Sequence, residues 1–133
     1  MGIYKKIVIK IGTNVLADRI FGINFARVES IAKNVTSLKN SGIDVVIVSS
    51  GAIGAGATAL KLKDKPKTIP EKQATAAVGQ PLLMEAYENA FRRLGETVAQ
   101  MLLTKDDFTD RDRYCNAKNT FDVLLDKKAI PII

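Results

Sequence analysis

Two short runs of small and polar residues, at positions 10–13 (KIGT) and 48–52 (VSSGA), follow strongly apolar stretches. A chain that leaves a buried strand through Ser50 and Gly51, into a helix starting near Ala52, aims free backbone N–H groups at one spot. The helix dipole favours an anion there, and Gly51 lets a ligand approach the backbone closely. Ligands of open α/β sheets bind beyond the carboxyl ends of the strands. These residues therefore predict a small-molecule anion site.

The same residues also have a plainer interpretation. A strand followed by Ser-Ser-Gly can be an ordinary turn into a helix, with Ser49 or Ser50 as the N-cap. The glycines at 51, 54 and 56 have the order G-x-x-G-x-G rather than the dinucleotide fingerprint G-x-G-x-x-G. No P-loop pattern G-x-x-x-x-G-K-[ST] occurs in the chain. From these residues alone, both the anion site and the capped turn stay open.

Lys10 is an unusual residue inside the apolar run 7–11. Burying an unpaired ammonium is costly, whereas at the carboxyl end of a strand a bound anion would pair with it. The alternative is a lysine that snorkels from an edge strand. Gly12 and Thr13 then form a second turn rich in hydrogen-bond donors. Two such turns after two successive strands support a ligand site better than either one alone.

Composition narrows the chemistry that these 133 residues can perform. The chain has no histidine and one cysteine, Cys115, so histidine acid–base chemistry, histidine metal sites and cysteine-rich zinc sites are excluded. A lone cysteine forms no internal disulfide and suits a reducing cytoplasm. No apolar run is long enough to cross a membrane. We therefore expect a cytoplasmic protein with no membrane contact and no metal site of its own.

The formal net charge of +6 raises the question of nucleic-acid binding. Much of the excess comes from four lysines at 61, 63, 65 and 67, in a stretch that also holds Pro66. No aromatic side chain is interleaved there for base stacking. The pattern favours a solvated basic loop over a nucleic-acid surface, and the charge would in either case attract anionic substrates.

Hydrophobic periodicity predicts alternating strands and helices. Strands are expected at 3–11, 45–48 and 97–103, with a fourth starting at 130. Helices are expected from an N-cap at Asn24 to about 40, at 52–62, from Pro70 to 94, and at 112–128, while 15–23 reads as a loop. The order strand, helix, strand predicts a right-handed βαβ unit and an α/β fold with a mainly parallel sheet.

Three local features leave alternatives open. Gly79-Gln80-Pro81 favours a helix boundary, with a kink as the alternative. The neighbouring Asp106 and Asp107 favour a capped turn over metal binding or acid–base work. The apolar run 130–133 starts a strand whose faces and edges need cover, so the fold is expected to be truncated.

These segments resemble the amino acid kinase family, and within it the glutamate 5-kinases. The resemblance runs from Ile7 to Ile133 and rests on the motifs KIGT at 10–13, VSSGAIGAG at 48–56, KQ at 72–73, AAVGQ at 76–80, QMLLT at 100–104 and NA at 116–117. It implies a three-layer αβα sandwich with a mainly parallel sheet. Residues 1–133 would be the amino-terminal, amino-acid-binding half, with the nucleotide-binding half absent.

The resemblance also implies the reaction. ATP, with Mg²⁺, would phosphorylate the side-chain carboxylate of L-glutamate to γ-glutamyl phosphate, the first step of proline biosynthesis. On the matching positions Lys10 would contact the phosphate in flight, helped by the backbone of Gly12 and Thr13. Ser50, with the amides of Gly51 and Ala52, would hold glutamate. Because a carboxylate is already a nucleophile at neutral pH, catalysis would consist of positioning and charge neutralisation.

Further expectations concern partners. The resemblance implies feedback inhibition by proline, and exposed sheet edges in a truncated fold predict a homo-oligomer. The 133 residues alone are expected to be inactive, because they cannot assemble a complete ATP site. The alternatives are a related amino acid kinase that acts on another acid, and a non-catalytic amino-acid-binding or interaction module with the same fold.

Overall fold

A parallel four-stranded sheet forms the centre of the computed structural model, which describes residues 4–20 and 22–133. The strands are β1 (Lys6–Ile11), β2 (Asp44–Ser49), β3 (Val98–Gln100) and β4 (Ile130–Ile132), in the spatial order β1-β2-β4-β3. Every pairing is parallel, which confirms the predicted sheet. β1 begins later than expected, at Lys6, although residues 1–3 lie outside the described part. β3 is shorter than the expected 97–103 because it pairs with β4 at only three positions.

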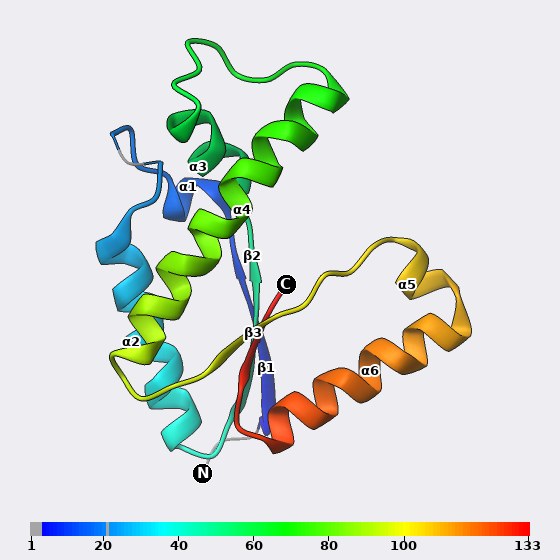
Figure 1. The fold of residues 1–133 in the computed structure, drawn as a ribbon. Coiled ribbons are helices and arrows are strands. Elements are labelled where there is room, and N and C mark those ends of the chain that lie inside the picture. The colour runs from blue at the N-terminus through cyan, green and yellow to red at the C-terminus, as the bar shows by residue number, and fades with distance from the viewer. Residues whose placement is uncertain (1–3, 21) are drawn as a thin grey trace.

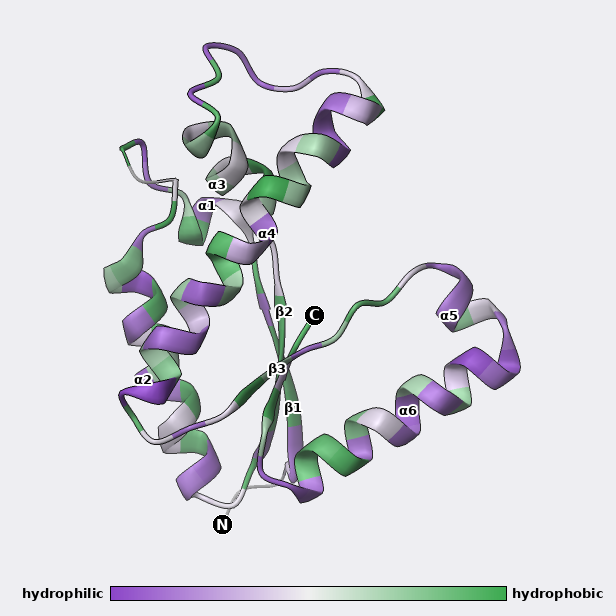
Figure 2. Cartoon of the chain, in the orientation of Figure 1, coloured by the Kyte–Doolittle hydropathy of each residue, from purple (hydrophilic) through white to green (hydrophobic). Residues whose placement is uncertain are grey.

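Helices cover both faces of this sheet, so the fold is the expected three-layer αβα sandwich (Figure 1). α2 (Phe25–Asn40) and α4 (Ile69–Arg92) lie on one face, and α6 (Arg111–Asp126) lies on the other. The connection from β3 to β4 therefore crosses the face opposite to the connections from β1 to β2 and from β2 to β3. The end of α6 nearest β4 is its most apolar part, whereas the other end diverges from the sheet (Figure 2).

The main core lies between the sheet and the α2–α4 layer. Alternate β-residues such as Ile11, Val45 and Ile47 pack there against buried helix residues such as Val28 and Phe91. The other face of β1 is open, since Val8 is 64% exposed and shares that face with Lys6 and Lys10 by the two-residue period of a strand. β1 is thus a half-covered edge strand.

The ends of α2 follow the sequence prediction. The Asn24 side chain accepts a hydrogen bond from the Arg27 N–H at 3.0 Å, as an N-cap does. Ile23 and Val28 are both buried, as in a hydrophobic staple. Gly42 ends the helix with φ +82°, the left-handed conformation that glycine adopts most easily.

The expected helix boundary at 79–81 is wrong, because α4 runs without interruption through Pro81. Proline removes one backbone hydrogen bond from a helix, but packing compensates here. α4 crosses α3 (Ala52–Ala59) so closely that a Cβ on Gly79 would lie 1.7 Å from the Ala52 carbonyl oxygen. After the proline, α4 continues with the buried residues Leu83, Ala86, Tyr87, Ala90 and Phe91. This tertiary burial holds the helix together.

Two single-turn helices were not expected from the sequence. α1 (Thr13–Leu16) takes up the start of the predicted loop, because Leu16 is only 1% exposed and packs into the core. α5 (Asp106–Thr109) follows β3. There Asp107 accepts hydrogen bonds from the Thr104 N–H and hydroxyl, which confirms the prediction of a capped turn. These bonds hold the pKa of Asp107 below its usual value.

The remaining elements agree with the sequence apart from their ends. α3 stops at Ala59, three residues short, and α6 begins at Arg111 after Asp110, whose side chain caps it through the Arg113 N–H at 2.9 Å. α4 begins one residue before Pro70, after a capping box formed by Thr68 and Glu71. None of the helices in the described ranges is long and apolar enough to span a membrane.

Candidate functional site

The two predicted turns lie side by side at the carboxyl edge of the sheet. Lys10 pairs with Val48 in the register of β1 and β2, and the Ser50 N–H donates to the Ile11 carbonyl at 2.9 Å. Parallel pairing thus brings together residues that are about forty positions apart in the sequence. β4 ends at the same edge, where the Ser49 N–H donates to the Ile133 carbonyl at 2.8 Å.

Lys10 combines both interpretations drawn from the sequence. It lies on the edge strand β1 with an exposed side chain, as the snorkelling alternative predicts, and it also lies at the carboxyl end beside the turns. Within the described residues it forms no ion pair. Its ammonium therefore remains available to an anion at this edge.

The capping interpretation of the second turn is wrong. Gly51, and neither serine, is the N-cap of α3, and no side-chain hydrogen bond caps that helix. Gly51 has φ +114°, a left-handed conformation that side-chain-bearing residues rarely adopt. The Ser49 hydroxyl instead donates to the Ser50 carbonyl at 3.0 Å and lies 2.9 Å from the Tyr87 hydroxyl.

Several backbone donors at this edge have no acceptor among the residues that the structure describes. They are the amides of Gly12, Thr13, Gly51 and Ala52. The Ser50 amide is not one of them, because it extends the ladder to Ile11. Ser50 can therefore offer its side-chain hydroxyl but not its N–H. The set of an ammonium, a hydroxyl and several N–H groups suits a carboxylate or phosphate.

Two features of this region escaped the sequence analysis. Gly56 allows close packing of α3 on α4, since a Cβ on it would lie 1.9 Å from the Thr75 carbonyl oxygen of α4. A glycine inside a helix costs stability, so its position within the expected helix 52–62 could have indicated close helix packing. Tyr87 was not among the predicted site residues, although a buried phenol needs a hydrogen-bond partner. Burial raises the pKa of Tyr87.

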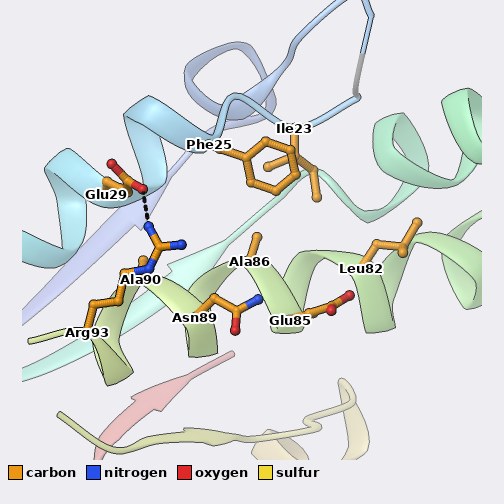
Figure 3. A pocket seen from close by; sticks show the side chains of 9 residues that line it. All are labelled: Ile23, Phe25, Glu29, Leu82, Glu85, Ala86, Asn89, Ala90 and Arg93. Carbon is orange, nitrogen blue, oxygen red and sulfur yellow. Dashed lines mark hydrogen bonds and ion pairs between the residues drawn. The ribbon is translucent and has the colours of Figure 1, made fainter. Parts of the chain in front are cut away.

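A separate groove of about 420 Å³ lies between α2 and α4 (Figure 3). Phe25 and Leu82 lie along it, and the Glu29–Arg93 ion pair, at 2.9 Å, closes one end. None of the six predicted site residues lines this groove. The candidate site is therefore at the carboxyl ends of β1 and β2. The groove lacks the set of hydrogen-bond donors that is found there.

The described residues offer no cluster for a metal ion. In residues 4–20 and 22–133, no group of three or more histidine, cysteine, aspartate or glutamate side chains is arranged so that it could hold a metal ion. Asp107 is engaged with Thr104. These residues therefore do not fit a resident Mg²⁺ site.

The amino-acid sequence matches a known protein family. The sequence model of the amino acid kinase family matches residues 5–133, nearly the whole chain. The α/β fold with its parallel sheet agrees with that match. The chain belongs to the amino acid kinase family, as the resemblance predicted.

Individual relatives of known activity indicate a more specific class than the family does. The glutamate 5-kinase of Clostridium tetani is 50% identical over 129 residues, which cover 97% of this chain and 48% of that enzyme. The glutamate 5-kinase of Geobacter metallireducens is also 50% identical over 129 residues, covering 97% of this chain and 35% of the relative. The glutamate 5-kinase of Thermoanaerobacter sp. (strain X514) is 49% identical over 128 residues, which cover 96% of this chain and 34% of the relative. The chain thus spans about half or less of the length of these relatives.

Proposed function

We propose that this chain is the amino-terminal, amino-acid-binding half of a glutamate 5-kinase, which transfers the γ-phosphoryl group of ATP to the side-chain carboxylate of L-glutamate. The observation that carries the proposal is the adjacency of Lys10 to the turn at 50–52, because Ser50 is hydrogen-bonded to Ile11. About 50% identity to glutamate 5-kinases along nearly the whole chain supports this substrate over other acids. It likewise favours an enzyme over a non-catalytic binding module.

Each site residue has a role in this proposal. Ser50, through its hydroxyl, and Gly51 and Ala52, through their N–H groups, hold and orient glutamate. Lys10 neutralises charge on the phosphoryl group as it moves, and the Gly12 and Thr13 amides bind its oxygens. The glutamate carboxylate attacks phosphorus directly, so no protein base has to remove a proton. ATP is the second substrate, and Mg²⁺, where it takes part, enters with the nucleotide phosphates rather than on carboxylates of this chain.

The remaining walls of the site belong, in this proposal, to a nucleotide-binding half that the 133 residues do not contain. Support comes from the coverage of the relatives, of which this chain spans 48% or less in the three cases above. The isolated chain should then bind glutamate without turning it over. The reaction fits the reducing cytoplasm, where the exposed free thiol of Cys115 would persist.

A chimera tests the function directly. Residues 1–133 replace the matching part of the Clostridium tetani enzyme, and γ-glutamyl phosphate is trapped with hydroxylamine. We expect ATP-dependent product from glutamate, and a loss of about 100-fold or more in kcat for Lys10→Met, because a transition-state charge contact is removed. The control Lys33→Met, an exposed lysine of α2, should keep full activity.

Three outcomes of that assay would overturn the proposal. They are an active Lys10→Met chimera, a preference for N-acetylglutamate or carbamate over glutamate, and turnover by the 133-residue chain alone. Adding L-proline to the same assay tests the proposed feedback inhibition, which should appear as a falling rate.

Self-association is a further part of the proposal. It is supported by the free edge of β1 and by exposed apolar side chains such as Val8 (64%), Leu102 (78%) and Phe108 (64%). Light scattering coupled to gel filtration should show a dimer or larger species that Val8→Lys weakens. Leu62→Lys, on the basic loop, should not weaken it. A monomer at every concentration tested would contradict the expectation.

A further inference from the structure

The side chain of Tyr87 is completely buried although it carries a hydroxyl group. Its ring is fixed by apolar packing, including a stacked contact with Phe91 at a centroid distance of 6.4 Å. A phenylalanine would fill the same space, so the hydroxyl is the feature that packing leaves unexplained. Its oxygen lies 2.9 Å from the hydroxyl oxygen of Ser49, the last residue of β2.

The direction of this hydrogen bond follows from counting hydrogens. The Ser49 hydroxyl donates to the Ser50 carbonyl at 3.0 Å. Because a serine hydroxyl carries one hydrogen, it can only accept from Tyr87, which must be the donor. Burial raises the pKa of Tyr87, so the phenol keeps its proton at neutral pH. The result is a relay from the Tyr87 hydroxyl through the Ser49 hydroxyl to the Ser50 carbonyl.

This relay fixes a peptide group at the candidate site. In a trans peptide, the carbonyl of one residue and the N–H of the next point in opposite directions. Holding the Ser50 carbonyl near the Ser49 hydroxyl therefore aims the Gly51 N–H away from that hydroxyl. In the described part of the chain, this N–H has no acceptor. The positive φ of Gly51 completes the geometry of the turn.

We infer that Tyr87 is a positioning residue which, through Ser49, aims the Gly51 N–H at an anionic group of the bound amino acid. The inference rests on the proposed function of the turn at 50–52. Tyr87 does not touch the ligand. It removes the freedom of one peptide group to rotate, so that a donor is already oriented when glutamate arrives.

The test follows the Gly51 amide resonance of the ¹⁵N-labelled 133-residue chain during titration with L-glutamate. Tyr87→Phe deletes only the hydroxyl. We expect its glutamate Kd to rise about threefold to tenfold, the worth of one hydrogen bond, and the Gly51 resonance to move before any ligand is added. The matched control is Thr36→Val, which removes a buried hydroxyl that lacks a partner among the described residues. That variant should bind like the wild type.

A mutant cycle separates positioning from general destabilisation. Ser49→Ala and the double variant should lose affinity to the same extent as Tyr87→Phe, because all three break one relay. Losses that multiply, or wild-type affinity in Tyr87→Phe, would overturn the inference while leaving the proposed function intact. If glutamate shifts neither the Gly51 nor the Ala52 amide resonance of the wild-type chain, both the inference and the proposed function are overturned. If Tyr87→Phe fails to fold, the glutamate Kd of Ser49→Ala is compared with that of Thr36→Val. A weaker affinity only in Ser49→Ala supports the inference, and equal affinities overturn it.

Discussion

Gly12 and Gly51 both open the candidate site, but for different physical reasons. Gly51 has φ +114°, so any side chain there would strain the backbone. Gly12 has an ordinary φ of −77°, and an added Cβ would meet nothing within 4 Å. Neither conformation nor packing within the described residues explains a glycine at position 12. In the proposed function, the phosphoryl group would approach the backbone closely at this position, and a side chain would obstruct it.

Glu71 should stabilise the start of α4 in a pH-dependent way. Its carboxylate accepts hydrogen bonds from the Thr68 and Lys67 N–H groups, at 2.9 and 2.8 Å, and these lower its pKa below the usual 4.5. Stabilisation from such a group is fully present above the unfolded-state pKa and is lost as pH falls through the lower folded-state value. Wild type should therefore exceed Glu71→Gln in stability from pH 7 down to about 4.5, and the difference should vanish in stronger acid.

Urea unfolding of both proteins across that pH range measures the difference. Glu85→Gln, on the exposed side of the same helix, leaves both capping bonds in place and serves as the control. A difference between Glu71→Gln and wild type that stays constant to the lowest pH would show that the capping carboxylate is not responsible.

At the scale of elements, the crossing of α3 and α4 decides how the site is supported. α3 begins at Ala52, so its first turn belongs to the candidate site, and α4 carries Tyr87 behind it. Gly56 and Gly79 let the two backbones touch. The same contact helps α4 to continue through Pro81. Helix packing and site geometry are therefore coupled through these two glycines.

Alanine substitutions test this coupling. Gly79→Ala places a Cβ 1.7 Å from the Ala52 carbonyl oxygen, so the helices must separate, and we expect a loss of about 3 kcal/mol or more in unfolding free energy. Gly54→Ala is the matched control within α3, because its Cβ would lie 4.0 Å from the nearest atom. It should stabilise the protein by about 0.5–1 kcal/mol through helix propensity. Equal unfolding free energies for the two variants would contradict the close crossing.

In the molecule as a whole, the two ends of the parallel strands differ in what their residues do. The carboxyl edge carries the candidate site. At the amino edge the Lys39 ammonium, at the end of α2, donates to Glu96 ahead of β3 and to the Lys128 carbonyl ahead of β4, the latter at 2.7 Å. The side chains of Lys39 and Glu96 are only 13% and 14% exposed. One cation thus ties together three connections of the fold.

Removing that cation should destabilise the whole fold. Lys39→Met strands a largely buried carboxylate, and we expect a loss of about 2–3 kcal/mol in urea unfolding. Lys33→Met, from the exposed side of α2, should change little. Adding Glu96→Leu to Lys39→Met should recover part of the loss, because no charge is then left unpaired. A double variant less stable than the single one would refute this account.

Local chemistry explains which predictions from the sequence were confirmed. Hydrophobic periodicity indicated the strands and helices, Asn24 marked the start of α2, and a capped turn was expected at Asp106 and Asp107. Each depends on residues within a few positions of one another, whose preferences act before the chain is folded. The resemblance of the motifs at 10–13 and 48–56 to the amino acid kinase family was likewise confirmed by the family match.

Long-range contacts account for the rest. Packing against α3 overrides the helix-breaking tendency of Pro81, and burial of Leu16 creates the unexpected turn α1. Only strand register brings Lys10 beside the turn at 50–52. Only the placement of α4 brings the Tyr87 hydroxyl to Ser49, a serine whose local sequence had suggested a capping role. By itself the sequence determined the elements and the chemical character of the turns. Tertiary structure decided which donors have no acceptor within the described residues, because those contacts join residues far apart in the chain.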